Sequence, residues 1–123
     1  MKRKKILVAD DEPHILRSLK LVLEEAGYSV VTATDGEEAF HKTREEKPDL
    51  LILDIKMHTM NGYEVYHRLQ TDPLQRDIPV MILTALGQAD RKSEKVGAHI
   101  FDVITKPFSP YSIVDKVKEI LRK

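Results

Sequence analysis

Polar residues that could hold a cation and a phosphoryl group follow four separate apolar runs of this chain. The runs cover 5–9, 50–53, 80–83 and 103–105, and the residues at their ends are Asp10, Asp11, Asp54, Thr84 and Lys106. If the runs are strands of one parallel sheet, their ends share an edge with three carboxylates, a hydroxyl and an ammonium. Oxygen ligands in a partly open site favour Mg²⁺. A cation there would leave one carboxylate oxygen free to attack phosphorus.

The chemistry of this edge follows from the charges that it brings together. Clustered carboxylates repel, so at least one pKa should rise unless a cation intervenes. Thr84 could donate a hydrogen bond to a phosphoryl oxygen. Lys106 could pair with Asp54 at rest and with a phosphoryl oxygen after transfer. The Lys106–Pro107 bond is a candidate cis peptide, because only X–Pro bonds adopt cis at low cost.

The elements that must position these residues alternate between strand and helix patterns. The runs at 5–9, 50–53 and 80–83 are continuously apolar, which is typical of parallel strands covered on both faces. A short strand is expected at 28–33, and another ends at 105. Helical spacing predicts helices at the ranges 13–26, 37–46, 62–69, 88–96 and 113–121. This pattern predicts an α/β fold: a doubly wound (βα)5 sandwich, flavodoxin-like, with a five-stranded parallel sheet of order 2-1-3-4-5.

Composition limits the possible partners and the place of action. The chain has 123 residues, with 20 Lys+Arg and 20 Asp+Glu, so its formal net charge is zero. A neutral chain is not expected to bind nucleic acid or a membrane directly. It has no cysteine and no long apolar run, which fits a reducing cytoplasm and argues against a signal peptide. We expect one domain over 1–123, with no room for an output domain after the last helix.

Five sequence segments carry a resemblance to a known family. They are ILVADDEP, PDLLILDIKM, MNGYE, PVMILTA and ITKPF, in chain order. The chain resembles the response-regulator receiver domains of two-component signalling, including the chemotaxis regulators, over nearly its whole length. The resemblance implies a protein that is not an enzyme and that receives a phosphoryl group from a sensor histidine kinase or a phosphotransfer protein. It would then switch conformation and signal to a partner or an output domain.

The same resemblance implies a role for each site residue. Asp54 would be the phosphoacceptor. Asp11 and Asp54 would bind Mg²⁺ directly, Asp10 would act through water, and the backbone carbonyl of Lys56 would be a further ligand. Thr84 would be the switch hydroxyl, and Lys106 would pair with the phosphoryl group. A homodimer through the helix at 88–96, the strand ending at 105 and the last helix is a further possibility.

Three positions depart from the family pattern. His58 replaces the usual Pro, and Val103 stands where the family has Tyr or Phe, whose rotation reports phosphorylation. Phe101, two residues earlier, should face the same side of the strand. It could substitute for the missing aromatic residue, but we expect it to be part of the core. Gly97 is displaced from its usual place, which predicts a shorter helix at 88–96 and a longer segment at 98–101.

Two other functions fit part of the pattern. The first is an aspartyl phosphatase, but such enzymes usually carry an acidic residue two positions after the nucleophile, where this chain has Lys56. The second is a receiver-like binding module without phosphorylation, which Val103 favours and the intact site opposes. The remaining histidines show no metal-ligand spacing and are expected to face solvent; they are His14, His41, His67 and His99.

Overall fold

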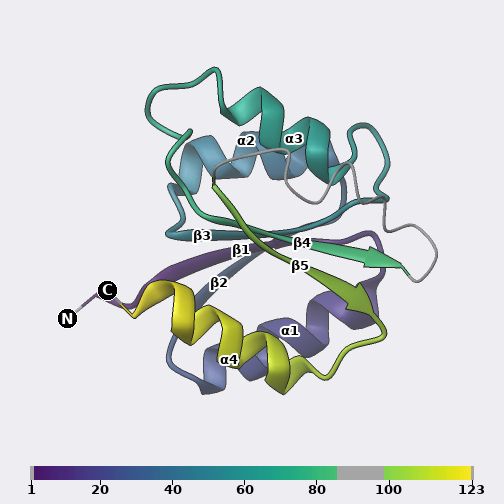
Figure 1. Cartoon of the computed structure of the whole chain (residues 1–123), viewed down its shortest axis with the longest axis vertical. Coiled ribbons are helices and arrows are strands. Elements are labelled where there is room, and N and C mark those ends of the chain that lie inside the picture. Colours follow the sequence, from purple (N-terminus) through teal and green to yellow (C-terminus); the bar gives the residue numbers. More distant parts are fainter. Residues whose placement is uncertain (1, 86–98, 123) are drawn as a thin grey trace.

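The computed structural model describes residues 2–85 and 99–122, and its centre is a parallel sheet of five strands (Figure 1). The strand order is β2-β1-β3-β4-β5. The strands are β1 (Lys5–Ala9), β2 (Ser29–Ala33), β3 (Leu50–Asp54), β4 (Val80–Ala85) and β5 (Ile100–Lys106). The predicted fold class and strand order are therefore confirmed. The helix expected at 88–96 and the displaced Gly97 lie outside the described residues.

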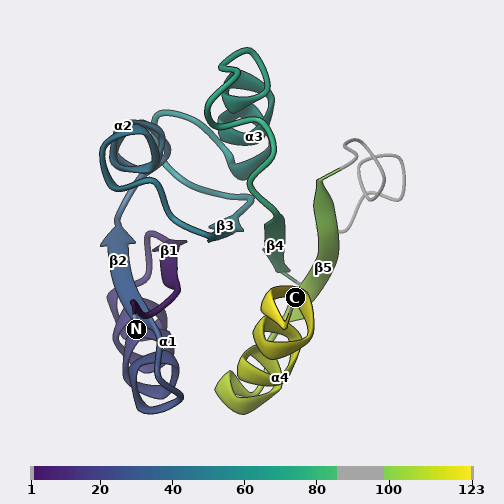
Figure 2. The same cartoon turned by 90° about the vertical axis from the view of Figure 1, so that its left-hand side faces the viewer.

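The described helices cover both faces of the sheet (Figures 1 and 2). They are α1 (Pro13–Glu25), α2 (Gly36–Glu46), α3 (Gly62–Leu69) and α4 (Pro110–Leu121). Helices α1 and α4 lie on one face, and α2 and α3 lie on the other. Alternate strand residues enter the two cores: Ile6 and Val8 face α1 and α4, whereas Leu7 and Ala9 face the other pair. Burial on both faces explains the continuously apolar strands.

Local sequence sets where the helices begin and end. Pro13 begins α1, where a missing N–H costs nothing. Gly27 follows the helix with φ of 103°, as expected for a left-handed residue after the last turn. Asp35 caps α2 through the Glu38 N–H, and Asn61 forms a reciprocal capping box with Glu64 at the start of α3. Within the described part of the chain, no helix is long and apolar enough to cross a membrane.

Strand β5 contains an irregularity that corrects one prediction. Val80 pairs with Ile100, but Met81 pairs with Asp102, so Phe101 is an extra residue in β5. The bulge breaks the alternation of side chains. Ile100 and Val103 therefore both pack toward the α2 and α3 side. The expectation that Phe101 is core is wrong, because its side chain is 58% exposed.

Candidate functional site

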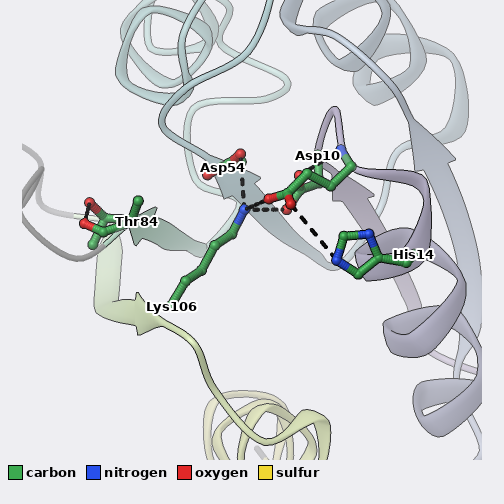
Figure 3. A network of polar contacts seen from close by, with 7 residues as sticks. Asp10, His14, Asp54, Thr84 and Lys106 are labelled. Carbon is green, nitrogen blue, oxygen red and sulfur yellow. Dashed lines mark hydrogen bonds and ion pairs between the residues drawn. The ribbon is translucent and has the colours of Figure 1, made fainter.

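The carboxyl ends of β1, β3 and β5 meet at one edge of the sheet, as the strand order predicts (Figure 3). Asp10 follows β1 and is fully buried, and Asp54 closes β3 with 3% exposure. Lys106 is the last residue of β5 and reaches both carboxylates. Asp11 is exposed beside them. Asp10 and Asp54, which are 44 positions apart in sequence, are thus neighbours because β1 and β3 pair directly.

The Lys106 ammonium is the centre of the polar network. Its Nζ lies 2.9 Å from Glu12 Oε1, 3.0 Å from Asp10 Oδ2 and 3.3 Å from Asp54 Oδ2. The expected resting pair of Lys106 with Asp54 is therefore present. The Lys106–Pro107 bond that precedes the turn into α4 is cis, as anticipated. The ammonium group of Lys106 thus pairs with three carboxylates at the sheet edge.

The electrostatics of the edge match the repulsion expected between its acids. Burial, with the nearby charge of Asp10, raises the pKa of Asp54 to about 7, although Lys106 acts in the opposite direction. Burial opposes the charge on Lys106, but the hydrogen bond to Glu12 and the negative charges of Asp10 and Asp54 outweigh it and raise the lysine pKa. The pKa of Glu12 is lowered by its hydrogen bond to Lys106. Burial and the neighbouring negative charges therefore disfavour the ionised form of Asp54.

Glu12 belongs to this network, although the sequence pattern did not single it out. It occupies the N-cap position of α1, but its side chain makes no capping hydrogen bond. It reaches Lys106 instead, while its backbone N–H donates to Asp10 Oδ1 at 3.0 Å. The side chains that usually cap a helix at this position are the shorter ones of Ser, Thr, Asp and Asn. The only signal in the sequence was its place directly after Asp10 and Asp11.

Thr84 is present at the edge but does not join the lysine network. It is fully buried at the end of β4. Its hydroxyl lies 3.4 Å from the Ala85 carbonyl oxygen, a long hydrogen bond (Figure 3). In this conformation Thr84 lies apart from the pair formed by Asp54 and Lys106. A role for its hydroxyl at Asp54 would require that the side chain or the end of β4 move.

The loop at 55–61, between β3 and α3, packs closely around the site because two of the positions in contact with it are glycines. A Cβ at Gly62 would lie 2.5 Å from the Asp54 carbonyl oxygen, and one at Gly36 would lie 2.0 Å from the Met60 carbonyl oxygen. The Gly36 N–H donates to the His58 carbonyl oxygen at 3.0 Å. Lys56 lies in this loop with an exposed side chain. Close backbone contact thus fixes the loop that carries the Lys56 carbonyl.

The donor set at the edge suits a hard divalent cation. Asp10, Asp11 and Glu12 each offer a carboxylate oxygen, and these oxygens lie within 4.8 Å of one another. The ammonium of Lys106 forms ion pairs with Asp10 and Asp54, but the buried Oδ2 of Asp10 accepts no hydrogen bond from any residue that the structure describes. Cations of the Mg²⁺ type bind through one or two carboxylates and retain several waters. The residues present therefore fit such an ion, with Asp11 open to solvent.

Comparisons with known proteins agree on one kind of domain. A family model described as "Response regulator receiver domain" matches residues 6–118. The alkaline phosphatase synthesis transcriptional regulatory protein PhoP of Bacillus subtilis is 43% identical over 120 residues, which are 98% of this chain and 49% of that protein. The phosphate regulon transcriptional regulatory protein PhoB of Pseudomonas aeruginosa is 39% identical over 120 residues, 98% of this chain and 52% of PhoB.

A solved structure gives the same result for the fold. A CheY-like response regulator receiver domain protein from Methanospirillum hungatei superposes with a TM-score of 0.88 and 31% identity. The match covers 98% of this chain and 95% of that one. The chain spans about half the length of the curated relatives that it matches.

Proposed function

This chain belongs to the response regulator receiver family of two-component signalling, and from that premise we propose that Asp54 is its phosphoacceptor. The observation that carries the proposal is the buried Asp54 carboxylate, whose pKa is raised to about 7 beside Asp10 and Lys106. A carboxylate that is poorly stabilised by its surroundings gains most when its charge moves onto a transferred group. Perturbed groups of this kind are typical of functional sites.

In the proposed transfer, an Asp54 Oδ atom attacks the phosphorus of a phosphohistidine. The new O–P bond forms as the P–N bond breaks, and the imidazole leaves with the bonding electron pair and takes up a proton. Lys106 Nζ lies 3.3 Å from Asp54 Oδ2, so it is placed to pair with a phosphoryl oxygen after transfer. Asp10 holds this ammonium from the side of β1 at 3.0 Å.

We propose Mg²⁺ as the cofactor, bound by Asp11 and Asp54, with Asp10 acting through water and the Lys56 carbonyl as a further ligand. A bound Mg²⁺ supplies positive charge that offsets the phosphoryl oxygens during transfer. Thr84 would report the transfer, because its hydroxyl would leave Ala85 to reach the new acceptor oxygens. Such a change would shift a pre-existing two-state equilibrium rather than build a new fold.

The partner is a sensor histidine kinase or a phosphotransfer protein, the kind with which response regulators work. We propose further that residues 1–123 form one receiver domain that acts in the cytoplasm and does not itself bind nucleic acid. Dimerisation through β5, α4 and the segment at 88–96 remains part of the proposal. The domain is a signalling module, and we propose no turnover of external phosphate esters, since Lys56 takes the place of the acid that such enzymes need.

The proposal is tested by labelling with a small phosphodonor. The protein is incubated with acetyl phosphate and Mg²⁺, and its intact mass is measured. One added phosphoryl group is expected, and it should be absent from Asp54→Asn and when EDTA removes the metal. The matched control is Asp77→Asn, because the Asp77 side chain is 82% exposed and outside the site. Equal labelling of Asp54→Asn and the parent chain would disprove the assignment.

A further inference from the structure

Glu12 makes a side-chain contact that its position at the start of α1 does not require. It occupies the N-cap position of α1, where a capping side chain would accept a hydrogen bond from the first turn, but it makes no such bond. Its side chain instead crosses to Lys106, which is 94 residues away in sequence, and its Oε1 accepts from Nζ at 2.9 Å. The other oxygen, Oε2, lies 3.8 Å from Nε2 of His14, a contact that becomes an ion pair when the imidazole is protonated. The hydrogen bond of this carboxylate is thus made across the site to Lys106 and not to the start of α1.

The distances show that Glu12 and Asp54 share the ammonium of Lys106. Nζ is closer to Glu12 Oε1, at 2.9 Å, than to Asp54 Oδ2, at 3.3 Å. The Glu12 side chain is 46% exposed, whereas that of Asp54 is 5% exposed. Water can therefore solvate Glu12 when it releases the lysine. Asp10 holds Nζ from a buried position at 3.0 Å and is not free to withdraw in this way.

We propose that Glu12 is a positioning residue that restrains Lys106 on the α1 side and competes with the phosphoryl group on Asp54 for its ammonium. The inference rests on the proposed function, because it concerns how the same site responds to phosphorylation. In the resting domain, Glu12 stabilises the unphosphorylated arrangement. After transfer, Lys106 must give up this contact to pair fully with a phosphoryl oxygen. Glu12 therefore disfavours the phosphorylated arrangement of the site.

The size of the effect follows from the exposure of Glu12. Ion pairs with one exposed partner contribute a few tenths to about 1 kcal/mol, which corresponds to up to about a five-fold change in binding. Removing the charge of Glu12 should therefore tighten the binding of a phosphoryl mimic by about two- to five-fold. Because the effect acts through the lysine, it should disappear when Lys106 carries no charge.

The test is a double-mutant cycle with beryllofluoride, a mimic of the phosphoryl group, in the presence of Mg²⁺. Affinities are measured by calorimetry for the parent chain, Glu12→Gln, Lys106→Met and the double variant. The matched control is Glu24→Gln, which removes a carboxylate from the same helix. Glu24 Oε2 pairs with Lys20 Nζ at a distance of 2.8 Å, and this pair lies outside the site. Circular dichroism checks the fold, and Lys106→Gln replaces Lys106→Met if the latter does not fold.

We expect tighter binding for Glu12→Gln, no change for Glu24→Gln, and no effect of Glu12→Gln once Lys106 is neutral. Equal or weaker binding by Glu12→Gln would overturn the inference. The same tightening in the neutral Lys106 background would also overturn it. Weaker affinity of Glu12→Gln for Mg²⁺ alone, with no tightening, would identify Glu12 as a metal ligand instead. If the parent chain binds no beryllofluoride and takes up no phosphoryl group, the proposed function fails first.

Discussion

Replacing Asp54 with Asn should stabilise this domain, although it removes a residue that contacts Lys106. Asp54 is 3% exposed, and its carboxylate lies near the charges of Asp10 and Asp11. The substitution keeps the shape of the side chain and removes the buried negative charge. The expected gain in free energy of unfolding is largest where Asp54 is ionised, at neutral pH and above.

The magnitude follows from the raised pKa. A rise from the usual 3.8 to about 7 means that ionising Asp54 in the folded state costs up to about 4 kcal/mol, since one pKa unit is about 1.36 kcal/mol. This figure already includes the favourable effect of Lys106. The amide of the substituted Asn cannot reproduce every contact of the acid, which takes part of this gain away. We therefore expect Asp54→Asn to raise the free energy of unfolding by about 2 to 4 kcal/mol, roughly 10 °C in melting temperature.

The pH dependence gives the sign of the effect. Below pH 3.8, Asp54 is protonated in both the folded and the unfolded state, and the carboxylate carries no penalty. Between pH 3.8 and about 7, the folded state keeps a proton on Asp54 that the unfolded chain has released, so the contribution of Asp54 to the stability of the parent falls as pH rises. Above that window the difference between Asp54→Asn and the parent should be constant.

Urea unfolding of both proteins across this pH range, without Mg²⁺, is the assay. The difference in free energy of unfolding should grow from near zero at the acid end to its full value near neutrality. The reasoning would be refuted if Asp54→Asn were less stable than the parent at neutral pH. A difference that does not change with pH would also refute it.

Three further predictions concern the metal, the site loop and the bulge. At ten times its Kd, Mg²⁺ should stabilise the parent by about 1.4 kcal/mol in thermal unfolding, and Asp54→Asn by less; an equal gain would place the ion elsewhere. Gly62→Ala should cost about 1–3 kcal/mol and weaken Mg²⁺ binding in calorimetry, because its Cβ would lie 2.5 Å from the Asp54 carbonyl oxygen. The control is Gly27→Ala. Its Cβ would meet nothing within 4 Å, so although alanine is strained at a φ of 103°, the substitution should leave Mg²⁺ affinity unchanged. Phe101→Ser should change stability by less than about 0.5 kcal/mol in urea unfolding, whereas Val103→Ala should cost about 1 kcal/mol or more; the reverse order would mean that Phe101 is core.

The strand ends could be predicted because each rests on a local pattern. Apolar runs covered on both faces stop where a polar residue must face the edge, which placed Asp10, Asp54 and Lys106 correctly. Parallel topology then made them neighbours without any knowledge of side-chain contacts. The pairing of Lys106 with Asp54 and a raised pKa for at least one of the carboxylates followed from elementary electrostatics, and the structure assigns the raised pKa to Asp54.

What the sequence did not predict depends on contacts between distant elements. The bulge in β5 is set by how Ile100 and Asp102 align with Val80 and Met81, and an isolated strand pattern does not contain that register. Regular alternation therefore misplaced Phe101. The contact between Glu12 and Lys106 joins residues 94 positions apart, so no local pattern around Glu12 indicates it.

The most direct test of the central claim is to locate the phosphoryl group in the chain. After incubation with acetyl phosphate and Mg²⁺, borohydride reduces an aspartyl phosphate to homoserine, and tandem mass spectrometry of the peptides identifies the residue. We predict homoserine at position 54 alone, dependent on both the phosphodonor and Mg²⁺. Homoserine at position 10 or 11, or no reduction product in a chain that carries the added mass, would contradict the account.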